Sequence, residues 1–133
     1  MNTTEKAIEL HNAGYNCCQA VACAFAEKLG IDEEILFKIA EGFGLGMGGT
    51  KCTCGAVSGA VMLAGIKNSG GLSQRTKAAT YKLSSKIVDD FIAKNQSVIC
   101  SEIKGINTGK VLRSCSGCIE DAVKIAEDVL NLK

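Results

Sequence analysis

Apolar residues recur along this chain at the three- and four-residue spacing of α-helices, and no proline interrupts them. No segment shows the strict alternation of apolar and polar residues that is typical of a half-buried strand. A hydrophobic fraction of 47% in 133 residues is enough for one core. We therefore predict an all-α, single-domain helical bundle over residues 1–133. One helix is expected before Gly14, and the others over residues 17–29, 33–41, 55–66, 73–95 and 115–130, with a short segment at 100–103.

A glycine-rich loop of residues 42–54 lies between the second and third main helices and ends in Cys52 and Cys54. Glycine lets the backbone pass close to a bound group and direct amide N–H groups at sulfur. The loop therefore favours a functional role for Cys54 over simple packing. It also contains the Gly-x-Gly-x-x-Gly spacing of dinucleotide-binding loops, but it follows a helix rather than a strand, which argues against nucleotide binding.

The charge and the apolar pattern argue against several classes of partner. The formal net charge is +1 and like charges never cluster, so no nucleic-acid or anionic membrane partner is expected. Apolar stretches are too short to span a bilayer. The first residues lack a basic region followed by an apolar run, so we expect a cytoplasmic protein. Thiols stay reduced in the cytoplasm, so eight cysteines favour metal binding or redox-active thiols over permanent disulfides.

The eight cysteines occur at five places in the sequence. Several are expected at helix starts, where free amide N–H groups and the positive end of the helix dipole favour thiolate. Cys115 and Cys118 share one face of a first helical turn, so they could bind one metal or close a disulfide. Cys23 is expected to pack as a small buried hydrophobe, and His11, the only histidine, to lie at the surface. The five places are Cys17 with Cys18, Cys23, Cys52 with Cys54, Cys100, and Cys115 with Cys118.

Five motifs give the chain a recognisable layout. They are Asn16-Cys17-Cys18-Gln19-Ala20-Val21, Gly42-Phe43-Gly44 with Gly46-Met47-Gly48, Cys54-Gly55-Ala56-Val57-Ser58-Gly59-Ala60, Cys100-x-Glu102-Ile103-x-Gly105, and Cys115 ahead of Ala122. In these motifs the chain resembles the C_GCAxxG_C_C family, which is described as redox-active and occurs mostly in anaerobic bacteria and archaea. The resemblance covers nearly the whole chain. The chain is also similar to the non-haem domain of split-Soret cytochromes c, which is described as holding an iron–sulfur cluster.

The resemblance implies a ligand set for a metal cofactor. The family's four cysteines fall on Cys17, Cys54, Cys100 and Cys115. Cys18 stands where an alanine is common, and Cys23, Cys52 and Cys118 are additional to the family pattern. The chain has no Cys-x-x-Cys-His sequence for haem attachment, so electron transfer to haem is not implied.

Three functions fit these residues. The leading hypothesis is an electron carrier with a [2Fe–2S] or [4Fe–4S] cluster, because four thiolates complete the ligand shell of such a cluster. The backbone at Gly46, Gly48 and Gly55 would then supply amides around the cofactor. A thiol–disulfide redox protein or oxidoreductase would use the same cysteines without any cofactor. A structural zinc site would use Cys52, Cys54, Cys115 and Cys118.

All three hypotheses require distant cysteines to meet in the fold. We expect Cys17, Cys54, Cys100 and Cys115 to converge, with Cys23 outside the group. The expected partner is another redox protein, whose identity the sequence does not specify. Whether a substrate is turned over, and whether the chain forms a homodimer, are both left open.

Overall fold

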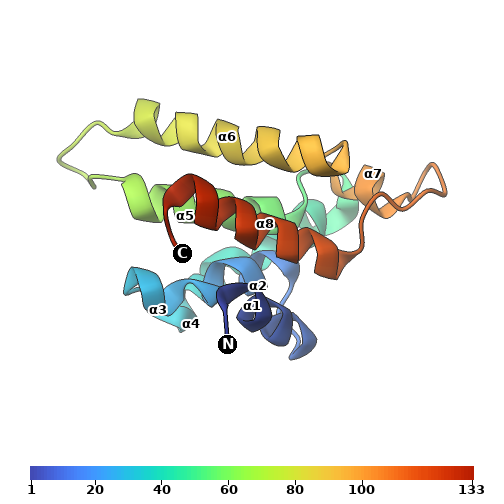
Figure 1. Ribbon diagram of the computed structural model, residues 1–133, viewed down its shortest axis with the longest axis horizontal. Coiled ribbons are helices and arrows are strands. Elements are labelled where there is room, and N and C mark those ends of the chain that lie inside the picture. Colours follow the sequence, from blue (N-terminus) through green and yellow to red (C-terminus); the bar gives the residue numbers. More distant parts are fainter.

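The computed structural model describes residues 1–133 as eight α-helices with two short turns of other helical type (Figure 1). The helices are α1 (Thr3–Asn12), α2 (Cys17–Ala24), α3 (Ala26–Leu29), α4 (Glu33–Ala40), α5 (Gly55–Asn68), α6 (Lys77–Asn95), α7 (Cys100–Lys104) and α8 (Cys115–Leu130). The turns η1 (Glu41–Phe43) and η2 (Gly46–Thr50) lie between α4 and α5. No strand forms, and the extended residues pair only in an isolated bridge between Thr53 and Ile99. The predicted all-α fold is confirmed.

Side-chain caps determine where two of the cysteine-bearing helices begin. The Asn16 side chain accepts a hydrogen bond from the Gln19 backbone N–H, and the Gln19 side chain accepts one from the Asn16 backbone N–H. This reciprocal cap starts α2 at Cys17. Ser114 Oγ accepts a hydrogen bond of 3.0 Å from a first-turn N–H and starts α8 at Cys115.

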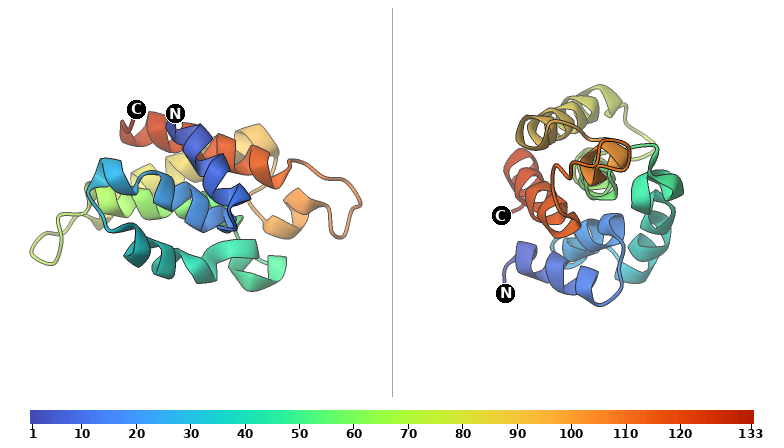
Figure 2. Two further views of the ribbon diagram at one scale, coloured as in Figure 1. Left: turned by 90° about the horizontal axis from the view of Figure 1, so that it is seen from below. Right: turned by 90° about the vertical axis from the view of Figure 1, so that its right-hand side faces the viewer.

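The helix α5 lies at the centre of the bundle, where it packs against α2, α6 and α8 (Figure 2). Its small residues allow a close approach to α2: a Cβ on Gly59 would lie 2.9 Å from the backbone oxygen of Cys18. Fully buried Phe25, Phe91 and Leu63 are among the largest side chains of the core around it. Burial of side chains of this size stabilises the fold by about 1.5–3 kcal/mol each.

Two predicted helices differ from the structure at their boundaries. The helix predicted over residues 17–29 divides at Phe25, whose φ of −101° and ψ of 1° leave the helical range, so that α3 follows α2 at an angle. The helix predicted over residues 73–95 begins only at Lys77. The residues before it form a turn that contains Gly71, with a φ of +84°.

One end of the bundle gathers the irregular segments of the chain. The turn η2, the helix α7 and the loop between α7 and α8 lie at this end, opposite the loop that joins α5 and α6 (Figures 1 and 2). The helices α5 and α8 also begin here. No helix has both the length and the apolar character needed to cross a membrane.

Candidate functional site

The four cysteines of the predicted ligand set all lie at helix N-termini. Cys17, Cys100 and Cys115 are the first residues of α2, α7 and α8, and Cys54 is the N-cap residue of α5. The first backbone N–H groups of a helix have no partner within the helix and carry partial positive charge. Of the four sulfurs, that of Cys54 receives hydrogen bonds from two such N–H groups, those of Ala56 and Val57.

These N-termini meet around one pocket with a cavity volume of about 220 Å³. Cys17, Cys54, Cys100 and Cys115 line it, together with Cys118. The predicted convergence is therefore confirmed, whereas the role of the four cysteines as ligands stays a prediction. The other lining residues, none of them a carboxylate, are His11, Asn16, Leu45, Gly55, Ile103, Lys104 and Arg113.

Cys118 is the pocket thiol that lies outside the ligand set implied by the family resemblance, although the sequence analysis paired it with Cys115 and included it in the zinc alternative. It follows Cys115 by one turn of α8, is 2% exposed, and lies against Cys54. Hydrogen bonding from Cys118 outweighs burial and, with two backbone N–H groups of α5 and the charge of Lys104, lowers the pKa of Cys54 to about 7. The same contact raises the pKa of Cys118. The Cys-x-x-Cys spacing pairs Cys118 with Cys115 in the sequence, whereas the structure sets Cys118 against Cys54.

Burial has the opposite effect on two other pocket thiols. It raises the pKa of Cys17 to about 12, with further contributions from Cys115 and Cys54. It also raises the pKa of Cys100. Among the thiols with shifted pKa values, Cys54 alone is shifted downward, so it is the strongest candidate for a thiolate at neutral pH.

Three cysteines lie outside the pocket. Cys23 is fully buried, with its Sγ 3.8 Å from the backbone oxygen of Glu33, as expected for a packing residue. Cys18 is buried with its Sγ 3.6 Å from the sulfur of Met62. Cys52 is exposed, so the structure does not gather the four cysteines of the zinc hypothesis. No three His, Cys, Asp or Glu side chains in the chain are arranged to bind one metal ion.

The glycine-rich loop holds Cys54 and Cys100 beside each other. Gly46 has a φ of +60°, and a Cβ on it would lie 2.5 Å from the Cβ of Cys100. The Cys100 N–H donates a hydrogen bond of 2.8 Å to the Cys52 carbonyl, and the Cys54 N–H donates one of 2.7 Å to the Val98 carbonyl. These contacts tie the loop to the start of α7 and fix the positions of both thiols.

The remaining glycines of the predicted site differ in their placement. Gly55 lines the pocket, whereas Gly48 is exposed and has open space where a Cβ would lie. The same loop contains Leu45, Met47 and Thr50 at φ values of 56°, 65° and 65°. Such values are uncommon for residues other than glycine. The conformation of the loop is therefore maintained by its surroundings.

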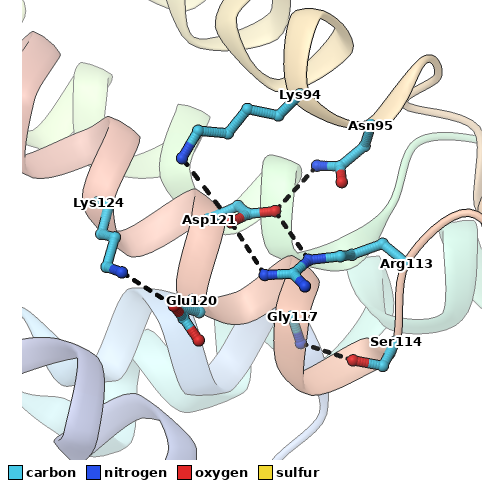
Figure 3. A network of polar contacts seen from close by, with 8 residues as sticks. All are labelled: Lys94, Asn95, Arg113, Ser114, Gly117, Glu120, Asp121 and Lys124. Carbon is cyan, nitrogen blue, oxygen red and sulfur yellow. Dashed lines mark hydrogen bonds and ion pairs between the residues drawn. The ribbon is translucent and has the colours of Figure 1, made fainter.

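Two cations, Arg113 and Lys104, line the pocket, and they are held in different ways. Arg113 is engaged by the buried carboxylate of Asp121, to which its Nε and Nη2 donate hydrogen bonds of 3.1 and 3.3 Å (Figure 3). Asn95 donates a further hydrogen bond of 3.1 Å to the same carboxylate. Lys104 forms no ion pair with a carboxylate, and its Nζ lies 3.3 Å from Cys115 Sγ. Hydrogen bonding to Cys115 raises the pKa of Lys104.

The sequence analysis expected His11 at the surface, but the structure places it in the pocket wall. Its side chain is half-buried, and its Nδ1 lies 3.0 Å from the backbone oxygen of Tyr15. The contact forms because the chain reverses between α1 and α2 and returns this carbonyl to the end of α1. His11 thus borders the thiols, but one of its ring nitrogens is already engaged by the backbone.

Comparison with known proteins identifies the family. Residues 15–129 match the family described as "Putative redox-active protein (C_GCAxxG_C_C)". No curated protein and no solved structure matches the chain significantly, so the similarity to split-Soret cytochromes c stays a prediction. The match spans most of the chain and includes every cysteine of the pocket. The chain therefore belongs to the C_GCAxxG_C_C family of redox-active proteins.

Proposed function

We propose that this protein transfers electrons through an iron–sulfur cluster that is held by Cys17, Cys54, Cys100 and Cys115. The observation that carries the proposal is the meeting of these four cysteines, from four separate helix starts, around a single cavity. Four thiolates are the usual protein ligands of a [2Fe–2S] or [4Fe–4S] cluster. Such a cluster would supply one-electron chemistry that none of the side chains can perform alone.

The chemistry of the pocket fits an anionic cluster. Its lining offers soft sulfur ligands, which suit iron–sulfur clusters. It contains no carboxylate, a ligand that favours harder metal ions. The thiols line a cavity and do not form a set for one metal ion. That arrangement suits a cluster of several metal atoms, whose ligands are spread around it, better than it suits zinc. Lys104 would balance part of the negative charge of four thiolates.

Metal analysis of anaerobically prepared protein tests the proposal. We expect iron and acid-labile sulfide in amounts that correspond to one cluster per chain, together with broad visible absorption from charge transfer between sulfur and iron. Zinc is measured in the same samples, because stoichiometric zinc without sulfide would support the structural alternative. Protein that stays colourless and free of iron after reconstitution with iron and sulfide would contradict the cluster.

A second candidate function is thiol–disulfide exchange by Cys54 and Cys118. The observation that favours it is the placement of these two buried thiols in the wall of one cavity, where hydrogen bonding from Cys118 lowers the pKa of Cys54 to about 7. The thiolate is the attacking form in disulfide exchange, and the second thiol resolves the mixed disulfide. Cys54 would therefore act as the nucleophile and Cys118 as the resolving cysteine.

The pH dependence of alkylation tests this second candidate. In cluster-free protein we expect the rate at which iodoacetamide modifies Cys54 to rise with pH around a midpoint of about 7, because the thiolate fraction increases through the lowered pKa. Cys118→Ala should move the midpoint upward, since it removes the hydrogen bond, and Cys118→Ser should restore part of the shift. Mass spectrometry in a Cys52→Ser background assigns the modified residue. An unchanged midpoint in Cys118→Ala would rule out the pair.

A further inference from the structure

We infer that the cysteine pocket accepts small anionic disulfides and thiols in preference to neutral ones, and that Lys104 confers this selectivity. The inference rests on the second candidate function, the exchange chemistry of Cys54 and Cys118, and adds the class of substrate. It comes from the distribution of charge around the cavity, which leaves one cation without an acidic partner.

The charges that line the pocket do not cancel. No carboxylate lines the cavity, and Arg113 pairs outside it with Asp121 at 3.1 and 3.3 Å, a carboxylate that also pairs with Lys94 at 3.8 Å. Lys104 forms no ion pair, and its closest polar partner is Cys115 Sγ at 3.3 Å. The nearest acidic residue on α7, Glu102, accepts a hydrogen bond from the Ser97 hydroxyl. A small anion that enters the cavity therefore meets one uncompensated positive charge.

The position of Lys104 is fixed by the backbone around it. Ile103 is 2% exposed and anchors α7 in the core, and its carbonyl accepts a hydrogen bond of 2.9 Å from the Leu112 N–H. Gly105 ends the helix at a φ of +70° and lies against the backbone of Lys110. With the backbone fixed in this way, the contact with Cys115 Sγ at 3.3 Å places the ammonium group at the pocket wall, where a positive charge concentrates anions and stabilises a departing thiolate.

The small disulfide is itself the oxidant of the two protein thiols, so the reaction needs no other reagent. The Cys54 thiolate attacks one sulfur of a small disulfide, a new sulfur–sulfur bond forms, and the original bond breaks to release one thiolate. Cys118 then loses its proton and attacks the Cys54 sulfur, which releases the second thiolate. The two protein thiols are oxidised to one disulfide, and the small disulfide is reduced to two thiols. An anionic thiol drives the reverse reaction.

Two disulfide reagents of different charge test the selectivity. The probes are dithiobis(nitrobenzoate), which is dianionic, and uncharged dipyridyl disulfide, each added to cluster-free Cys52→Ser protein near neutral pH. The measured quantity is the ratio of the two second-order rate constants for oxidation of Cys54, with the site assigned by mass spectrometry. A change in the thiolate fraction of Cys54 affects both reagents and cancels in this ratio.

We expect Lys104→Gln to lower the ratio of the anionic to the neutral rate constant about tenfold, the lower end of electrostatic steering effects. Lys104→Arg should keep the ratio, and so should Lys110→Gln, which removes an exposed lysine that does not line the pocket. Added salt should lower the ratio in protein that retains Lys104. This salt series tests the proposal even if a Lys104 variant fails to fold.

The outcomes separate the two levels of the proposal. If both reagents join Cys54 to Cys118, but the ratio is insensitive to salt and to Lys104→Gln, charge selectivity is overturned and the exchange function stands. If neither reagent oxidises Cys54, the exchange function fails and the substrate class falls with it.

Discussion

The Cys54→Ser protein is expected to remain colourless after anaerobic reconstitution with iron and sulfide, whereas the parent protein gains visible charge-transfer absorption. Cys54 lies where the start of α5 meets the starts of three other helices, so its loss removes one of four ligands from the centre of the site. Cluster binding is linked to the folded state of its site, so the melting temperature of the reconstituted variant should also fall below that of the parent. Absorption spectra, iron content and thermal unfolding measure the effect.

The matched control is Cys52→Ser, which makes the same chemical change two residues away at an exposed position outside the pocket. This variant should keep both the absorption and the iron content. Cys118→Ser tests the assignment of ligands, because Cys118 is the fifth thiol of the pocket. If Cys118→Ser loses the cluster and Cys54→Ser retains it, the ligand set named here is wrong.

Gly46→Ala is expected to lower the free energy of unfolding by about 2–4 kcal/mol, through backbone strain and overpacking together. The φ of +60° at this position disfavours any residue with a Cβ, and that Cβ would lie 2.5 Å from the Cβ of Cys100 and 3.0 Å from the Cys52 carbonyl oxygen. The clash should also displace Cys100 and thereby reduce the iron bound after reconstitution. Urea denaturation and iron analysis measure the two effects.

Gly48→Ala is the matched control for this prediction. Gly48 has a φ of +85° in the same loop, but no atom lies within 4 Å of the position of its added Cβ. We expect only the conformational cost there, about 1 kcal/mol, and no loss of iron. Equal effects at Gly46 and Gly48 would show that the contact with Cys100 contributes nothing to stability.

The helices were predictable from the sequence because their signals are local. Regular spacing of apolar residues predicted most of the helices. The division at Phe25 was not predicted, because the apolar spacing continues from Cys17 to Leu29 and gives no local sign of a break. The positive φ values of Leu45 and Met47 escape prediction for a similar reason, since these residues rarely adopt them alone.

The site was predictable only in part. Motifs identified four of its cysteines, but the spacing that puts Cys118 on the same helix face as Cys115 does not reveal that this face meets Cys54. Lys104 carried no signal, because a single lysine in a short helix is ordinary. Its significance depends on the pairing of Arg113 with Asp121, for which the Arg113 side chain crosses the first turn of α8 at Gly117.

The origin of the pocket thiols in four separate helices has a consequence for how the protein matures. The first and last of the four cysteines are Cys17 and Cys115, so no fragment that ends before α8 contains the complete set. During synthesis Cys115 is the last of the four to leave the ribosome, and it joins the other three only when α8 docks on α5. A cofactor that needs all four ligands must therefore engage a finished tertiary structure, because an unfinished chain offers it at most three of them.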